Sequence, residues 1–264
     1  MAKKKRNFKR VLPLGDLHCG HVVGLTPSSL NPRYDDEERN AMSLYREGCW
    51  AWFMTRLAPY MPIDVVVVNG DAIDGKGERS GGTEQITTDR NEQIHMAKTI
   101  IDWVNPKEVH FVAGTPYHTG VQEDWELALA RMYDKKLHDE LNLDVNGKIF
   151  NFKHFIGGSQ IPHGRATSIM KDRLWNQLWA ESEEFPKANV IVRNHVHYNI
   201  VIDQPEFVAA IMPALQGYGS KFGTRKVSGK VHFGFMVFDV DDNGGLSWER
   251  EILQMPYSAP VVAK

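Results

Sequence analysis

Short apolar runs alternate along the chain with longer segments whose apolar residues recur at helical spacing. The run at residues 63–68 ends in four successive valines, which is too short for a helix and too apolar for a strand with one face in water. It therefore predicts a central parallel strand covered on both faces. Other apolar runs predict strands at residues 8–14, 109–113, 149–153 and 190–193.

Helical spacing predicts helices between these strands, at residues 41–58, 88–104, 121–141 and 166–184. Acidic residues 35–38 suit the positive end of the first helix, in which we interpret Trp50, Trp52 and Phe53 as core packing. A hairpin turn is expected at Asn146-Gly147. Later runs predict antiparallel strands of a second sheet, with a tight turn before the last, at residues 199–202, 207–212, 230–240 and 246–253.

The predicted strands share a chemical feature, because Asp, His or a small polar residue follows each one. Asp16 and His18 are two positions apart, so in an extended segment both side chains emerge on one face, within reach of one ion. Asp71 follows Gly70 at the tip of the valine-rich strand, where open α/β sheets bind ligands. Each signal alone has an ordinary explanation as turn chemistry or a structural histidine. Repeated carboxylates and imidazoles at strand ends are nevertheless what a divalent metal needs.

The order and spacing of these residues resemble the calcineurin-like metallophosphoesterase superfamily, from about residue 10 to about residue 200. The resemblance is carried by Asp16-x-His18, Gly70-Asp71-x-x-Asp74, the segment from Gly114 to His118, His154, and His195-x-His197. It implies an α/β/β/α sandwich of two mixed sheets flanked by helices. It also implies a two-metal centre at the C-terminal ends of the strands.

Carried over by position, the resemblance implies a set of metal ligands. The ligands of the first metal would be Asp16, His18 and His197. Asp71 would bridge both metals, while Asp74 is expected behind the ligands or in the turn itself. The second metal would take His154, His195 and a ligand from the third motif.

The third motif departs from the family pattern, which is Gly-Asn-His and then an acidic residue. In this chain Thr115 stands where the metal-binding Asn would be, and His118 arrives two residues late. Thr115, His118 or a water could complete the second site. Pro116 stiffens the turn and Thr115 already occupies the Asn position, so we favour His118 as proton donor to the leaving group.

The fourth motif has two candidates. We favour His154 as the ligand because it ends a predicted strand, whereas His163 lies in a loop that contains Gly and Pro and is assigned to substrate binding. Asn194 stands where the family commonly has Gly, which should alter the turn more than the ligation.

Two Gly-rich loops are predicted near the substrate. Residues 75–82 follow the second motif, and Lys76 or Arg79 could meet a phosphate there, although a plain surface loop is an equally good interpretation. Residues 216–229 are rich in Gly, Lys and Arg and form the second candidate.

The composition limits the number of domains and the kinds of partner that are expected, and it does not change the predicted fold. The 264 residues, 42% of them hydrophobic, suffice for a single α/β domain over residues 1–264, of which residues 1–7 are expected to be a disordered basic tail. A formal net charge of −2 gives no general attraction to nucleic acid or to anionic membranes. Two cysteines make no disulfide framework. No apolar run is long enough for a membrane span, and no signal peptide is recognised. Together these features favour a location in the cytoplasm.

The expected function is the hydrolysis of phosphomonoesters or phosphodiesters by a hydroxide that bridges two divalent ions. The ions would come from Mn, Fe, Zn and Ni, with Mn favoured. Two alternatives remain open. One is a DNA exonuclease or endonuclease of the same superfamily, with nucleotide or nucleic acid as substrate, and the other is a metal-binding regulatory protein without catalysis.

Overall fold

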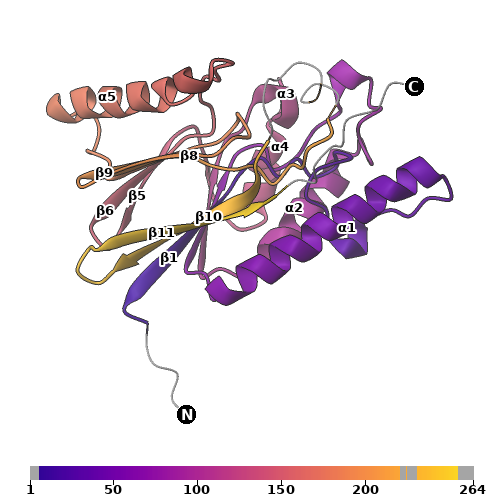
Figure 1. The fold of residues 1–264 in the computed structure, drawn as a ribbon, viewed down its shortest axis with the longest axis horizontal. Coiled ribbons are helices and arrows are strands. Elements are labelled where there is room, and N and C mark those ends of the chain that lie inside the picture. Colours follow the sequence, from indigo (N-terminus) through magenta and orange to yellow (C-terminus); the bar gives the residue numbers. More distant parts are fainter. Residues whose placement is uncertain (1–5, 221–223, 225–230, 255–264) are drawn as a thin grey trace, which may run out of the picture.

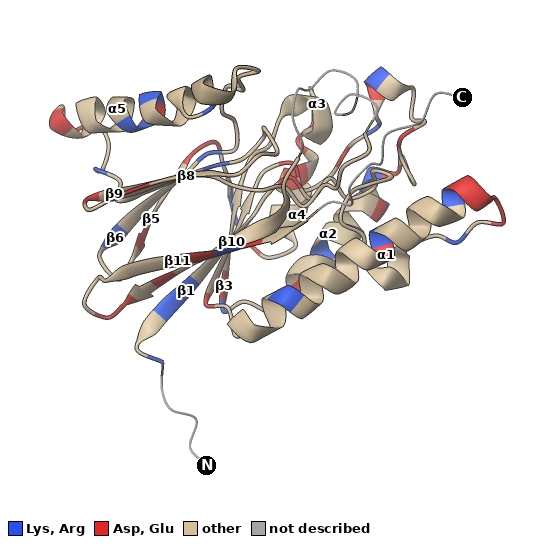
Figure 2. Cartoon of the chain, viewed as in Figure 1, with Lys and Arg blue, Asp and Glu red and all other residues tan. Residues whose placement is uncertain are grey.

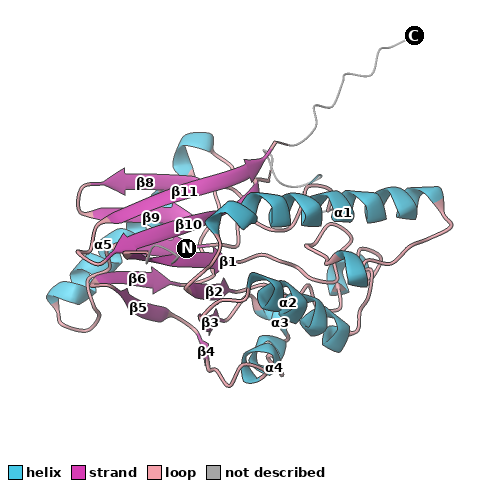
Figure 3. Ribbon diagram, turned by 90° about the horizontal axis from the view of Figure 1, so that it is seen from below, coloured by secondary structure: helices cyan, strands magenta, loops and turns pink. Residues whose placement is uncertain are grey.

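Two β-sheets pack face to face, and helices cover the outer surface of each (Figure 1). The computed structural model describes residues 6–220, 224 and 231–254 of the chain. Figure 3 shows α2, α3 and α4 gathered on one side of the strands. This arrangement is the α/β/β/α sandwich that the sequence predicts.

The first sheet has six strands in the order β11-β10-β1-β2-β3-β4. The strands β1, β2, β3 and β4 run parallel to one another, and β10 and β11 are antiparallel to their neighbours, so the sheet is mixed. Their bounds are β1 Phe8–Leu14, β2 Val65–Asn69, β3 Glu108–Val112, β4 Leu137–His138, β10 Phe233–Asp241 and β11 Leu246–Leu253. All five residues of β2 are buried, which confirms the central parallel strand.

The second sheet has five strands in the order β5-β6-β7-β9-β8. It is also mixed, because β6, β7 and β9 are parallel while β5 and β8 are antiparallel edge strands. The bounds are β5 Leu141–Val145, β6 Lys148–Phe152, β7 Val190–Arg193, β8 Ile200–Gln204 and β9 Phe207–Ile211. The predicted turn at Asn146-Gly147 joins β5 to β6.

The helices are α1 Glu37–Leu57, α2 Arg90–Val104, α3 Pro116–Thr119, α4 Trp125–Arg131 and α5 Thr167–Glu181. Short 3-10 turns lie at Ser28–Leu30, Ala58–Tyr60, Glu78–Ser80 and Pro162–Gly164. Asp36, Asp89 and Asp124 begin α1, α2 and α4 by accepting a hydrogen bond from a backbone N–H of the first turn.

Three apolar layers hold the sandwich together. Val66 and Val68 of β2 face α1 and α2, whereas Val65 and Val67 face the second sheet. The all-valine sequence therefore reflects two apolar faces on one strand. A third, smaller layer lies between the second sheet and α5, around Ile169. Trp50 and Phe53 of α1 are buried in the first layer, as predicted.

Three structural expectations are wrong. The strands β10 and β11 were assigned to the second sheet, but β10 pairs with β1 in the first, where its nearly continuous apolar run is buried on both faces. β9 is parallel to its neighbour β7, and only its other neighbour, β8, is antiparallel to it. The helix expected at residues 121–141 is limited to α4, because residues 141–145 alternate apolar and polar side chains and form β5.

Two basic residues near the N-terminus form ion pairs with the sandwich. Arg6, placed by the sequence in a disordered tail, forms an ion pair of 2.8 Å with Asp64. Arg10 in β1 pairs with Asp239 of β10 at 2.5 Å. Lys3, Lys4 and Lys5 lie outside the described residues.

Cys19 and Cys49 are both buried and free. No helix in the described part of the chain is both long and apolar enough to cross a lipid bilayer.

The layer between the sheets should be sensitive to loss of volume. Phe150 is fully buried there and contacts the ring of Phe238 at 5.7 Å between centroids. We expect Phe150→Ala to lower the free energy of unfolding by about 3–5 kcal/mol in urea titrations. The matched variant Phe155→Ala removes a ring that is 56% exposed and should change it by no more than about 0.5 kcal/mol. Equal losses would contradict this account of the core.

Candidate metal centre

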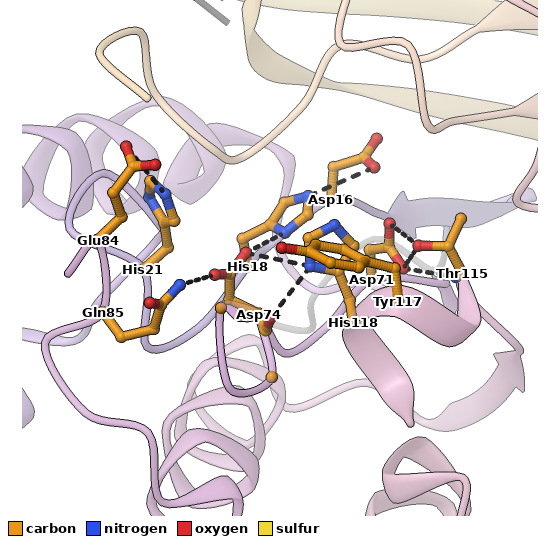
Figure 4. Close-up of polar contacts among 12 residues, drawn as sticks. Asp16, His18, His21, Asp71, Asp74, Glu84, Gln85, Thr115, Tyr117 and His118 are labelled. Carbon is orange, nitrogen blue, oxygen red and sulfur yellow. Dashed lines mark hydrogen bonds and ion pairs between the residues drawn. The ribbon is translucent and has the colours of Figure 1, made fainter. Parts of the chain in front are cut away.

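The carboxyl ends of β1, β2, β3, β6 and β7 carry the candidate ligands. Asp16 and His18 follow β1, Asp71 and Asp74 follow β2, and Thr115 and His118 follow β3. His154 follows β6, and His195 and His197 follow β7. Figure 4 shows Asp16, His18, Asp71 and His118 gathered in one place although they come from different strands.

Five of the candidate ligands have an unusual backbone conformation. Left-handed φ angles between 44° and 75° occur at Asp16, His18, Asp71, His195 and His197. Residues other than Gly adopt this region rarely, and Asp and His are among those that tolerate it best. The strained turns direct the side chains off the strand axes and into a common space.

Two glycines allow neighbouring turns to approach closely. A Cβ on Gly70 would lie 2.5 Å from the ring of His154, and one on Gly114 would lie 2.3 Å from the backbone nitrogen and the carboxylate of Asp71. No side chain fits at either position. The Gly that precedes Asp71 and the Gly that precedes Thr115 are therefore required by ligand packing.

The first cluster consists of Asp16, His18 and His197. His197 Nε2 lies 3.4 Å from Asp16 Oδ1 and 3.3 Å from His18 Nε2. His18 Nε2 lies 3.9 Å from the same carboxylate oxygen. One atom from each side chain thus faces a common point, as the ligands of one ion do.

The second cluster consists of Asp71, His154 and His195. His154 Nε2 lies 3.0 Å from Asp71 Oδ2, but the two atoms do not have hydrogen-bond geometry. The rings of His154 and His195 are 5.4 Å apart. His154 Nε2 also lies 3.8 Å from Asp16 Oδ1, so the two clusters adjoin.

The donor atoms suit metal ions. Asn69 O accepts from His154 Nδ1 at 2.8 Å, and Asp74 Oδ1 accepts from His18 Nδ1 at 2.9 Å. Each bond keeps the proton on Nδ1, which leaves the Nε2 lone pair directed into its cluster, a common arrangement at metal-binding histidines. Asp16 Oδ1 and His154 Nε2 are buried without a hydrogen-bond partner. A cation would satisfy both atoms.

The ionisation of the site reflects paired opposite charges. Burial raises the pKa of Asp16, but His197 and His154 lower it to a net value well below the usual range. The pKa of Asp71 is lowered in the same way, against burial, chiefly by His154. Burial lowers the pKa of His154, but Asp71 raises it to about 10, so positive charge is favoured between the carboxylates. Burial and the charge of His154 lower the pKa of His195 to about 4, which keeps that ring neutral.

Thr115 sits against Asp71, the residue proposed to bridge the metals. Its backbone N–H donates to Asp71 Oδ1 at 2.6 Å, and its hydroxyl lies 3.0 and 3.1 Å from the two carboxylate oxygens. The hydroxyl donates to Asp71, and its lone pairs remain for a cation at the second cluster.

His118 lies outside the cluster of Asp71, His154 and His195 and groups instead with His18 and Asp74. Its Nδ1 donates to the carbonyl oxygen of Asp74 at 3.0 Å and lies 3.3 Å from Asp74 Oδ1. Burial lowers the pKa of His118, but the hydrogen bond to Asp74 and the charge of Asp71 raise it to about 9. This position supports the proton-donor assignment.

His154 and His163 occupy different environments. His154 is buried in the second cluster, whereas His163 is exposed in the 3-10 turn Pro162–Gly164 and belongs to none of the clusters among the described residues. This placement supports His154 as the ligand of the fourth motif.

The sequence did not predict the supporting roles of two residues, Glu126 and Asn194. Glu126 of α4 is buried and accepts the backbone N–H groups of Ala72 at 2.6 Å and Gly114 at 2.7 Å, so it ties the second motif to the third. Burial and the charge of Asp71 raise its pKa to about 8. Asn194 donates to Asp16 Oδ2 at 3.1 Å. In the sequence, only the position of Asn194 directly before His195 indicated a role for it, and no motif indicated a role for Glu126.

A cavity of about 840 Å³ opens onto the clusters. Arg79, expected near substrate, lines it, whereas Lys76 and His163 are not among the lining residues. Arg165 lines it as well. From the loop at residues 216–229, Gln216 and Ser220 line the cavity, and most of that loop lies outside the described residues.

No protein-family model and no curated protein matches the chain. Solved structures do resemble it. Vps29 of Cryptosporidium parvum has a TM-score of 0.47 and 12% identity over 95% of this chain and 100% of that one. Zn²⁺-complexed Vps29 of Entamoeba histolytica has a TM-score of 0.44 and 14% identity over 92% of this chain and 98% of that one. A novel archaeal phosphodiesterase has a TM-score of 0.43 and 9% identity over 92% of this chain and 99% of that one. All three TM-scores are below 0.5. The description of the fold therefore rests on the two sheets and the ligand positions of this chain itself.

Metal stoichiometry distinguishes the two histidine candidates of the fourth motif. We expect His154→Ala to bind one equivalent of Mn²⁺ fewer than the unsubstituted chain, because it removes a donor from the second cluster. His163→Ala should bind the same number of equivalents. Elemental analysis after gel filtration in the presence of Mn²⁺ measures both. The reverse result would place the ligand in the 3-10 turn.

Proposed function

We propose that the chain is a two-metal hydrolase of phosphate esters with the calcineurin-like metallophosphoesterase fold, and that it prefers phosphodiesters. The observation that supports this most directly is the pair of adjoining clusters at the carboxyl ends of strands from both sheets, open to one cavity. The first cluster would hold one ion, the second cluster and Thr115 would hold the other, and Asp71 would lie between them.

Two divalent ions at these clusters would activate a water molecule as the nucleophile and neutralise charge on the phosphoryl oxygens. Mn, Fe, Zn and Ni all accept mixed carboxylate and imidazole ligands, and we favour Mn. The residues of this chain hold the ions, orient the ester and supply a proton.

The cavity walls support binding of a phosphodiester. The guanidinium of Arg79 lies 4.4 Å from the ring centre of Tyr117, and that of Arg165 lies 4.6 Å from the ring centre of Tyr198. Guanidinium groups recognise phosphate oxygens in a bidentate manner. A volume of about 840 Å³ also has room for both alcohol groups of a diester. Lys76 and His163 remain predictions as substrate contacts.

His118 is proposed to protonate the departing alcohol oxygen. Asp74 orients its ring through Nδ1, which leaves Nε2 as the atom that gives up a proton. Its ring centre lies 4.5 Å from that of His18, so the donor stands beside the first cluster. Proton donation matters most for leaving groups that are poor.

Asp71→Asn tests the function. We expect turnover of bis(p-nitrophenyl) phosphate with Mn²⁺ to fall at least about 100-fold, because loss of residues that only support metal ligands already costs about 10–100-fold. Metal content should fall as well, whereas Asp74→Asn should keep the metal stoichiometry.

Asp242→Asn is the matched control. Asp242 is exposed in the turn after β10, at the opposite end of β1 from Asp16. The Asp242→Asn variant should hydrolyse bis(p-nitrophenyl) phosphate at the same rate as the unsubstituted protein. If metal binds but no ester in a panel of aryl monoester, aryl diester, cyclic nucleotide and DNA is hydrolysed, the regulatory alternative replaces this proposal. Cleavage confined to DNA would indicate the nuclease.

His118→Ala tests the proton donor. We expect the rate to fall on the order of 10²–10⁴-fold on an alkyl or nucleotide ester and much less on an activated aryl ester. Metal content should not change. Loss of one metal equivalent, with both ester types slowed equally, would show instead that His118 is a ligand.

A further inference from the structure

The helix α5 presents an apolar face to solvent. The exposed fractions lie between 38% and 56% for Met170, Leu174, Trp175, Leu178 and Trp179. Met170, Leu174 and Leu178 are four residues apart, as are Trp175 and Trp179, so these positions form one side of the helix. Figure 1 shows α5 on the outer surface of the second sheet, where no other helix or strand of the described residues covers it.

The inward side of α5 is more polar than the outward side. Ile169, Arg173 and Asn176 are its buried residues. Arg173 Nη1 donates to Ala188 O at 3.0 Å, while Asn176 accepts from Ala188 N at 2.9 Å and donates to Pro186 O at 3.1 Å. These bonds fix the rotation of the helix, so the apolar side remains outward.

The exposed side chains form a continuous surface. The rings of Trp175 and Trp179 stack at 5.6 Å between centroids, and Phe185 extends the row at 5.6 Å from Trp179. A shallow hollow of about 410 Å³ lies at the other end, between Met170 and Leu174. Contiguous apolar surfaces of this kind on soluble proteins mark interaction sites.

We propose that α5 pairs with α5 of a second copy of this chain, antiparallel across a two-fold axis that passes near Asn176. The sequence is self-complementary about that residue. Leu174 and Leu178 stand two positions before and after it, and Lys171 and Glu181 stand five positions before and after it. In an antiparallel pair, each Leu174 therefore meets the partner's Leu178, and each Lys171 meets the partner's Glu181.

Charge complementarity favours this occupant. Neither Lys171 nor Glu181 forms an ion pair among the described residues. Figure 2 shows acidic residues at the C-terminal end of α5. Together with Glu183 and Glu184, Glu181 makes that end unsuited to an anionic lipid surface, which amphipathic helices approach with basic residues.

A stable pair of copies needs more buried surface than the leucine contacts alone provide. A helix of 15 residues is about 22 Å long. A stable interface buries about 800 Å² on each partner, somewhat more than a typical exposed apolar patch. The hollow beside Met170 lies where the antiparallel arrangement brings the C-terminal turn of the partner helix, so the interface extends beyond the leucine contacts.

Sedimentation equilibrium tests the proposal. We expect the unsubstituted chain to form dimers and Leu174→Glu to raise the dimer dissociation constant at least about 100-fold, because a two-fold interface contains each substitution twice. Leu44→Glu is the matched control. Leu44 is 55% exposed on α1, and the variant should dimerise as the unsubstituted chain does.

A charge exchange provides a second test that leaves the apolar surface intact. Lys171→Glu and Glu181→Lys should each weaken the dimer about tenfold, and the double variant should restore it. A chain that is monomeric at every concentration, or a dimer that Leu174→Glu leaves unchanged, would overturn the proposal. So would a monomer that binds phosphatidylcholine–phosphatidylserine vesicles through the same leucine, because the face would then belong to a lipid surface.

Discussion

The close approach of two buried carboxylates, Asp16 and Asp71, is the constraint on which the candidate site depends. Charges buried away from water are unfavourable unless they are paired. Here His154 lies between them, with Nε2 3.8 Å from one carboxylate and 3.0 Å from the other. Positive charge at this point is what the surrounding structure stabilises. Divalent ions would satisfy that requirement, and they would supply the chemistry that the proposed hydrolysis of phosphate esters needs.

The sandwich supports this arrangement through a layer of residues behind the ligands. Asn69 at the end of β2 fixes the tautomer of His154, and its side chain donates to Asn194, which in turn donates to Asp16. Glu126 joins the turns that carry Asp71 and Thr115. Rigid strands and such supports hold the ligand residues in strained backbone conformations.

Asp74 connects the two functions that the site would perform. One of its carboxylate oxygens accepts from His18 at 2.9 Å, and the same oxygen lies 3.3 Å from His118. The single turn of α3 explains how His118 of the altered third motif still reaches Asp74. The helical turn Pro116–Thr119 folds the chain back, so that His118 lies close to Thr115. The delay of two residues in the sequence is thus absorbed by a helical turn.

The sequence by itself determined the strands that bear the motifs and the identity of the residues that gather at their ends. Period and composition are local properties, so the valine run and the Asp and His at strand ends were recognisable without a partner. Only the tertiary structure decided what depends on contacts distant in the chain. β10 joined the first sheet because its apolar faces are buried beside β1, and Glu126 became a support because α4 packs under two turns from other strands. The outward face of α5 was also hidden in the sequence, because helical spacing shows that a helix has an apolar side but not which side meets the sheet.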